Sequence, residues 1–199
     1  MAETDVNYIV YGTPESDSVL RTKSKLLHFP LSKEDLEDIR ILEYKYDNEE
    51  NCSGLAAPQI GITKKIIIFA TPSDPAFKKF RPDWTESIPK TIWINPSYRG
   101  IEDEGRREDY EACFSVAGVA GLVPRYKKIH YEAYDIHGTH LEGTAEGFLA
   151  RIMQHEIDHL EGVLFIDKAI PESVMSLEAY REKRRAALAE TSATPEVST

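Results

Sequence analysis

The residues of this chain most able to do chemistry are His155, Glu156 and His159, which stand in the order His-Glu-x-x-His. On an α-helix, residues four apart lie on one face a turn apart, so both histidines could bind one metal ion. Glu156 would project beside that ion, where a carboxylate can move a proton of a metal-activated water. A core helix could carry the same residues by chance, but on the order of one chain in a hundred would do so. We therefore favour the metal site.

The surrounding residues predict a buried helix, bracketed by Gly147 and Gly162. Apolar residues lie on several sides of the two histidines, which is typical of a helix inside a protein. These apolar residues are Phe148, Leu149, Ile152, Met153, Ile157, Leu160, Val163 and Leu164. Gly162 suits a left-handed cap at the end of the helix. Because two histidines are too few ligands for a metal ion, a third ligand must come from another segment.

Cys113 is a candidate for the third ligand. The chain has two cysteines, Cys52 and Cys113, and Cys113 lies in a short apolar segment at residues 111–116. Considered alone, such a cysteine is more often an inert buried residue. Beside a two-histidine site that lacks a ligand, its thiolate would complete a three-ligand catalytic centre with one open position.

A third segment, residues 52–61, contains the sequence Gly-Leu-Ala-Ala-Pro-Gln. Read alone, it is a turn rich in glycine and alanine that enters a strand, where small residues allow close packing. A phosphate-binding loop is disfavoured, because no Gly-Lys-Ser/Thr and no helix pattern follows. Gln59 supplies a neutral amide that could donate to a developing oxyanion without titrating.

Together these segments resemble peptide deformylase, a metalloenzyme family that removes the formyl group from N-formylmethionine. The family motifs Gly-x-Gly-Leu-Ala-Ala-Pro-Gln, Glu-Gly-Cys-Leu-Ser and Gln-His-Glu-x-Asp-His-Leu occur here at residues 52–59, 111–115 and 154–160. The resemblance spans about residues 17 to 168. The residues of the motifs are more similar to the organellar-type branch of the family. Cys52, Ala112 and Phe114 replace two glycines and a leucine of the family motifs. These changes remove no metal ligand and no catalytic residue, so the reaction is expected to be retained. They alter side chains near the site and so bear on the shape of the pocket and the substrate preference.

The resemblance implies that Cys113, His155 and His159 are the metal ligands and that a water occupies the remaining position. Glu156 would act as general base and then protonate the leaving amine. In this family the ion is usually Fe²⁺, and the same ligands also accept Ni²⁺, Co²⁺ or Zn²⁺. The products would be formate and a peptide with a free α-amine.

The same resemblance assigns further roles around the metal. The oxyanion would be held by the metal, the Gln59 side chain and the backbone N–H of Phe114. Glu111 and Arg125 match positions that form an ion pair, which would brace the segment carrying Cys113. The substrate pocket would be lined by Gly54, Phe148 and Ile152.

Two other functions are compatible with parts of this pattern. A zinc peptidase shares His-Glu-x-x-His and also polarises an amide carbonyl, although it requires neither the cysteine nor the Gln59 segment. A non-catalytic homologue would keep the fold without turnover, although Glu156, Gln59 and all three ligand candidates are retained.

The remaining pattern predicts an α+β domain over residues 1–170, with mixed, mainly antiparallel sheets packed around the buried metal-bearing helix. Ser32 and Asp35 form a capping-box signal that begins a helix. Strands are expected at residues 65–70, 91–98, 126–135 and 140–145. The Pro-rich residues 71–89 are expected to form an exposed loop. Residues 171–190 predict a charged C-terminal helix, and residues 191–199 a disordered tail.

Composition limits the partners of this chain. With 199 residues it is long enough for a substantial core, and its formal net charge of −10 argues against general binding to DNA or other nucleic acids. No run approaches the ~20 apolar residues that cross a bilayer, so no membrane partner is expected. Residues 1–11 lack a signal peptide, which predicts a cytoplasmic protein with free thiols. The expected partners are N-formyl-Met nascent peptides and, through the charged C-terminal helix, the ribosome.

Overall fold

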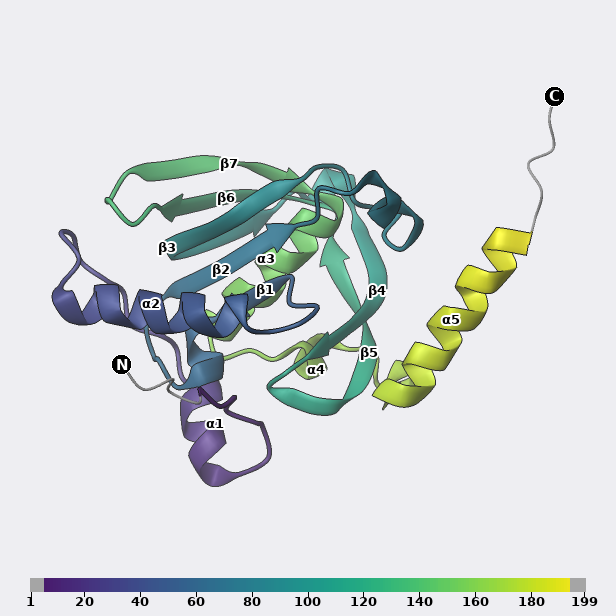
Figure 1. The fold of residues 1–199 in the computed structure, drawn as a ribbon, viewed down its shortest axis with the longest axis horizontal. Coiled ribbons are helices and arrows are strands. Elements are labelled where there is room, and N and C mark those ends of the chain that lie inside the picture. The colour runs from purple at the N-terminus through teal and green to yellow at the C-terminus, as the bar shows by residue number, and fades with distance from the viewer. Residues whose placement is uncertain (1–5, 194–199) are drawn as a thin grey trace.

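Helix α3 (Gly147–Leu160) lies between two antiparallel sheets and contacts strands of both, as Figure 1 shows. The structure is a computed structural model that describes the backbone of residues 6–193 and the side chains of residues 6–189. This arrangement confirms the predicted α+β class with antiparallel sheets around the helix that carries the two histidines.

The larger sheet has five strands in the order β1-β2-β3-β6-β7, each antiparallel to its neighbour. Its strands are β1 (Gly54–Ala56), β2 (Ile66–Thr71), β3 (Ile88–Gly100), β6 (Lys128–Tyr134) and β7 (His140–Glu146). The four strands expected from the sequence all belong to this sheet. The turn at residues 135–139 joins β6 to β7 as a hairpin.

Strand β2 shows why this sheet is covered on both faces. Ile67 and Phe69 pack into the cluster that contains the apolar residues of α3. Ile66 and Ile68 point the other way, into a cluster with Ile39 of helix α2 (Lys33–Asp47). Successive side chains of a strand alternate between the two faces of the sheet. An unbroken apolar run therefore indicates a strand that is buried on both faces.

The smaller sheet consists of β4 (Arg106–Cys113), β5 (Val116–Tyr126) and β8 (Met175–Ser176). The sequence pattern predicts only a short apolar segment here and does not indicate the β4–β5 hairpin. Strand β4 is dominated by charged residues, and β5 contains Gly118, Gly121 and Pro124, all of which are depleted in strands. Pairing between the two strands outweighs these weak local preferences, and it places Cys113 at the end of the hairpin, opposite Val116.

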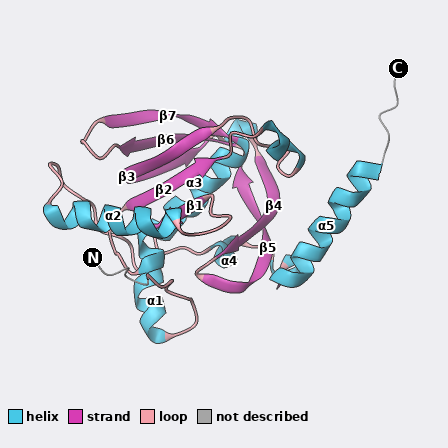
Figure 2. Cartoon of the chain, viewed as in Figure 1, coloured by secondary structure: helices cyan, strands magenta, loops and turns pink. Residues whose placement is uncertain are grey.

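The other α-helices of the described chain are drawn cyan in Figure 2, and the last of them projects away from the sheets. They are α1 (Pro14–Leu20), α2, α4 (Phe165–Lys168) and α5 (Leu177–Ala193). The predicted capping box of α2 is confirmed, because Ser32 and Asp35 each accept a hydrogen bond from the other's backbone N–H. Among the described residues, no helix is long and apolar enough to cross a membrane.

The C-terminal region differs from its predicted boundaries. Residues 171–173 form a 3-10 turn and β8 pairs with β5, so α5 begins at Leu177. The helix continues to Ala193, beyond the start of the predicted disordered tail, and residues 194–199 of that tail lie outside the described residues. Helix α5 begins beside β5 and projects outward from the rest of the chain (Figure 1).

The Pro-rich segment at residues 71–89 is a loop with one 3-10 helix (Pro75–Lys79), but it is not exposed throughout. Arg81 is buried, forms ion pairs with Asp83 and Asp109, and lies over the ring of Phe148 at 4.4 Å. Its charge is compensated by the two carboxylates, which allows the guanidinium to leave solvent. The loop is therefore anchored to the body of the chain through Arg81.

Candidate metal centre and its cleft

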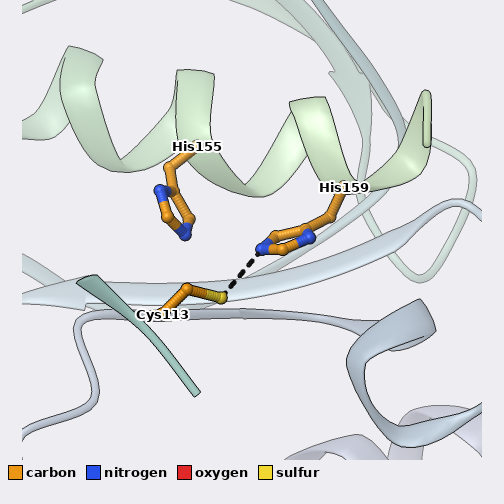
Figure 3. A group of neighbouring side chains, drawn as sticks. All are labelled: Cys113, His155 and His159. Carbon is orange, nitrogen blue, oxygen red and sulfur yellow. Dashed lines mark hydrogen bonds between the residues drawn. The ribbon is translucent and has the colours of Figure 1, made fainter. Parts of the chain in front are cut away.

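Cys113, His155 and His159 come together although they are distant in sequence. Both histidines point from α3 toward the end of β4, where Cys113 lies (Figure 3). One potential ligand atom from each residue lies within 4.8 Å of the others, and the Sγ of Cys113 is 3.3 Å from Nε2 of His159. Ligand atoms of a tetrahedral site with one sulfur and two nitrogens lie about 3.5 Å apart. The three residues therefore fit a single divalent cation.

The second ring nitrogens of the histidines have different environments. Nδ1 of His155 lies 2.8 Å from Oε2 of Glu111, which leaves Nε2 for a cation. Nδ1 of His159 is buried and has no hydrogen-bond partner among the described residues. Burial lowers the pKa of His159 well below its usual value, and the nearby positive charge of Arg125 also acts to lower it. Such a histidine stays neutral, which is the form that binds metals.

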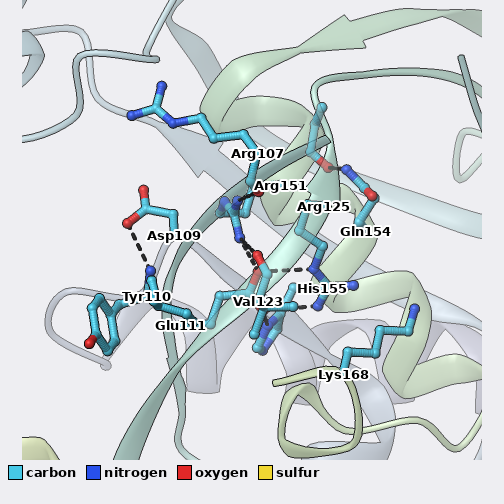
Figure 4. Close-up of polar contacts among 12 residues, drawn as sticks. Arg107, Asp109, Tyr110, Glu111, Val123, Arg125, Arg151, Gln154, His155 and Lys168 are labelled. Carbon is cyan, nitrogen blue, oxygen red and sulfur yellow. Dashed lines mark hydrogen bonds and ion pairs between the residues drawn. The ribbon is translucent and has the colours of Figure 1, made fainter. Parts of the chain in front are cut away.

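Glu111 is the centre of a buried ionic network that Figure 4 shows. Arg125 reaches both of its carboxylate oxygens at 2.9 Å, and Arg151 donates to Oε1 at 2.7 Å. Burial opposes ionisation of Glu111, but Arg125 and His155 outweigh this effect and hold its pKa far below its usual range. The carboxylate is therefore charged, and it accepts from two arginines and the histidine at the same time.

The network continues along α3 through Asp158. This carboxylate contacts Arg125 in a short ion pair, Lys168 at 2.7 Å and the hydroxyl of Tyr98 at 3.2 Å. Sequence reasoning named Arg125 but missed Arg151 and Asp158. Both are charged residues inside an otherwise apolar helix pattern, and such residues need partners when they are buried. That signal could have found them.

Gln59 is oriented by the backbone of its own turn. Its Oε1 accepts from the N–H of Ala56 at 2.8 Å, so its Nε2 faces the Sγ of Cys113 at 3.3 Å. An amide whose oxygen is occupied in this way has only its N–H groups available to the cleft. Gln59 is buried, which holds this orientation.

The N-terminal segment connects the two stretches that carry Gln59 and Phe114. The N–H of Ile9 donates to the carbonyl of Gln59, and that of Tyr11 to the carbonyl of Ser115, both at 2.8 Å. The ring of Tyr8 stacks on Phe114 with centroids 4.7 Å apart. Sequence reasoning missed this contribution, because nothing in the residues around Tyr8 carries a chemical motif.

Glu156 lies beside the metal site in a tight space. It is buried, and its Oε2 has no hydrogen-bond partner among the described residues. Burial, which disfavours the charged form, raises the pKa of Glu156 to about 7. A Cβ atom on Gly54 would lie 2.6 Å from Oε1 of Glu156, so the absence of a side chain at position 54 gives this carboxylate its room.

The metal centre opens into a cavity of about 920 Å³. Cys113, His155 and Glu156 line it together with the three expected substrate-binding residues, Gly54, Phe148 and Ile152. Phe148 and Ile152 are one helical turn apart on α3, so they present one apolar face to the cavity.

Cys52, the second thiol, also lines this cavity, and it donates a hydrogen bond to the carbonyl of Gly54. Burial, followed by the negative charge of Glu156, raises the pKa of Cys52 well above its usual range. A protonated thiol is a poor nucleophile, so the structure favours a packing role for Cys52 over a reactive one.

Comparison with known proteins places this arrangement in a family. Residues 9–174 match the family model described as polypeptide deformylase. The chain is 59% identical over 172 residues to peptide deformylase 2 of Rickettsia conorii, an alignment covering 86% of this chain and 85% of that protein. It is 38% identical over 157 residues to peptide deformylase 1 of Clostridium perfringens, covering 76% of this chain and 91% of that protein.

Solved structures agree with these relatives. The Met-Ala-Ser-bound crystal structure of class I type b peptide deformylase from Acinetobacter baumannii aligns with a TM-score of 0.66 and 26% identity, covering 81% of this chain and 97% of that chain. The peptide deformylase from Synechococcus elongatus in complex with actinonin aligns with a TM-score of 0.64 and 30% identity, covering 85% of this chain and 81% of that chain.

Gly54→Ala tests whether the position of Glu156 matters. The added methyl group would overlap the carboxylate and displace it, while the metal ligands stay in place. We expect stoichiometric bound metal, but a loss of hydrolytic rate of about 10²-fold or more, because a displaced acid–base group no longer reaches the reacting atoms. Metal analysis and steady-state kinetics measure the two effects. A wild-type rate in this variant would show that Glu156 need not occupy its observed position.

Glu111→Gln tests the network that orients His155. The amide keeps the shape of the side chain but removes the charge between the two arginines, so the free energy of unfolding should fall. Loss of this support should weaken metal binding by about 10–100-fold, as measured by competition with a chelator. Glu108→Gln is the matched control, since Glu108 is an exposed residue on the same strand. Equal metal affinity in the two variants would contradict the orienting role.

Proposed function

We propose, from the premise that this chain belongs to the peptide deformylase family, that it hydrolyses the N-formyl group of N-formylmethionine on nascent polypeptides and releases formate. The observation that carries this proposal is the convergence of Cys113, His155 and His159 on one cation-sized space that opens into the cavity. Peptide deformylases are metallohydrolases, and the donor set of this chain suits that chemistry.

We propose Fe²⁺ as the physiological ion. One thiolate and two imidazoles also suit Ni²⁺, Co²⁺ and Zn²⁺, so the donor set supports a divalent transition metal without choosing among them. When bound, such a cation would polarise the formyl carbonyl and lower the pKa of a water toward neutrality. The protein residues then determine where protons and charge go.

Glu156 is proposed as the group that moves the proton. It would accept a proton from the attacking water and then deliver it to the nitrogen of the leaving amine as the C–N bond breaks. Its unpartnered Oε2 and its burial beside the ligands support this role, because no other group of the described chain occupies that oxygen.

Gln59 and the backbone N–H of Phe114 are proposed to stabilise the negative charge that develops on the formyl oxygen. The Gln59 amide presents its Nε2 to the centre because its oxygen is held by Ala56. Phe114 directly follows Cys113 at the tip of the hairpin and is held by stacking on Tyr8. Donors that are fixed before the reaction cost no reorganisation during it.

The cavity beside the centre is proposed to bind the methionine side chain. Phe148 and Ile152 supply its apolar wall, and Gly54 permits close approach of the substrate backbone. The A. baumannii relative binds Met-Ala-Ser, so we propose formyl-Met-Ala-Ser as the test substrate. A peptidase or a non-catalytic homologue, the alternatives compatible with the sequence, would not account for the family match together with the retained catalytic set.

Helix α5 is proposed to dock the enzyme on the ribosome. Arg181 and Arg185 are exposed one turn apart on this helix, whereas Lys183 and Arg184 contact the body of the enzyme. Exposed arginines on a projecting helix can bind RNA phosphates although the whole chain is acidic.

Glu156→Gln should keep its metal and lose about 10²–10⁴-fold in the rate of formate release from formyl-Met-Ala-Ser. The amide has the shape of the carboxylate but cannot accept and deliver the proton. Anaerobically prepared protein should be assayed for both bound metal and formate. A variant that retains metal and most of its kcat/KM would remove Glu156 from the proposed role.

Cys113→Ser should lose tightly bound metal, because a neutral hydroxyl is a much weaker ligand than a thiolate. Cys52→Ser is the matched control and should stay stoichiometrically loaded, since Cys52 is not part of the ligand set. Metal content after dialysis against a chelator separates the two variants. Stoichiometric metal in Cys113→Ser would refute the ligand assignment.

The docking proposal predicts that Arg181→Glu combined with Arg185→Glu abolishes salt-sensitive co-sedimentation with ribosomes. Lys33→Glu combined with Arg40→Glu is the control, because it makes the same charge change at exposed residues of α2. Undiminished co-sedimentation of the α5 variant would argue against docking through this helix.

A further inference from the structure

Helix α5 contributes to the wall of the substrate cleft. Tyr180 and Arg184 line the same cavity as His155 and Glu156. The ring of Tyr180 packs against that of Tyr110 on β4, with centroids 5.0 Å apart. These contacts fix the first turns of α5 at the rim of the cleft, so the helix is part of the surface that a bound peptide would meet.

Arg184 is held in this wall by neutral groups. Its Nη1 donates to the hydroxyl of Tyr180 and its Nη2 to the carbonyl of Phe80, both at 3.2 Å. Among the described residues, no carboxylate lies within ion-pair distance of Arg184. The side chain is half-buried, so its guanidinium is oriented before any substrate arrives.

The neighbouring Lys183 has the same kind of environment. It donates to the hydroxyl of Tyr110 at 3.1 Å and lies over that ring at 5.0 Å. No ion pair of Lys183 occurs in the part of the chain that the structure describes. Lys183 is exposed and adds a positive charge beside Tyr110, whereas Arg184 itself lines the cavity, and no acid of the described chain forms an ion pair with either residue.

The other charged residues around the outer cleft differ from Arg184 because they are paired. Arg81 contacts two carboxylates, Asp83 and Asp109. Two acidic residues that line the cavity are paired as well, Asp47 with Lys90 and Glu49 with Lys45. Arg184 therefore stands out as a half-buried cation of the cleft that has no anionic partner among the described residues.

We propose that Arg184 is a specificity-determining residue that binds a carboxylate side chain of the peptide beyond its formylmethionine. This inference rests on the deformylase function, in which the formylated end lies at the metal centre and the rest of the peptide must leave along the cleft. The planar guanidinium suits a carboxylate, and its half-buried position in the cavity wall reduces screening by solvent. Peptides with an acidic residue near the start are thus favoured over peptides with a neutral one.

The test compares matched peptide amides, which lack a terminal carboxylate. Formyl-Met peptides carry glutamate or the isosteric glutamine at the second, third or fourth position, and kcat/KM is measured for each. Wild-type enzyme should favour glutamate about two- to fivefold in at least one position at low salt. The preference should disappear near 1 M salt, where charges are screened within about 3 Å.

Arg184→Gln should bring the Glu/Gln ratio to about one, and Arg184→Lys should restore part of it. Arg40→Gln, the same change at an exposed arginine of α2, should keep the wild-type ratio. Equal kcat/KM values for the glutamate and glutamine peptides in wild-type enzyme would overturn the proposal. An unchanged preference for glutamate in Arg184→Gln would overturn it as well. If Arg184→Gln instead weakens only ribosome co-sedimentation, the residue belongs to a docking surface and the proposal fails.

The neutral peptide formyl-Met-Ala-Ser amide separates this inference from the function on which it rests. If wild-type enzyme releases formate from this peptide but shows no preference for glutamate over glutamine peptides, only the role of Arg184 is refuted. If no peptide releases formate, the deformylase proposal is refuted instead.

Discussion

The burial of one charged carboxylate, Glu111, is the constraint on which the metal centre depends. A buried charge is costly unless it is fully paired, and Glu111 is paired with Arg125, Arg151 and His155. These partners come from β5 and from two turns of α3, so satisfying one carboxylate fixes the hairpin against the helix. The same contacts hold Nδ1 of His155 and turn its Nε2 toward Cys113.

A second constraint is close packing around the reacting space. Gly54 leaves room for the carboxylate of Glu156, and the N-terminal segment holds the backbone on either side of the centre through Gln59 and Ser115. The stacking of Tyr8 on Phe114 occurs where the family motif has a leucine. The larger aromatic side chain is accommodated by a partner from outside the motifs, so the substitution keeps the hairpin tip in place.

The sequence predicted the parts of this structure that are governed by regular patterns. The buried helix, four strands of the larger sheet and the capping box of α2 follow from apolar periodicity and local hydrogen bonding. The β4–β5 hairpin did not, because its charges are satisfied by residues far along the chain, such as Asp158 and Arg151. The motifs indicated which residues meet at the metal, but only the fold reveals Tyr8, Arg151 and Arg184, whose roles depend on neighbours distant in sequence.

The basic cluster of helix α5 is divided between two faces of the helix. In the sequence, Arg181, Lys183, Arg184 and Arg185 form one run of positive charge. In the structure, Lys183 and Arg184 contact Tyr110 and Phe80, whereas Arg181 and Arg185 are exposed; of the four, only Arg184 is half-buried. The helical repeat makes this division unavoidable, because adjacent residues are rotated by about 100° around the axis. A helix that binds the ribosome through one face would then hold its other face against the cleft, where the emerging peptide passes.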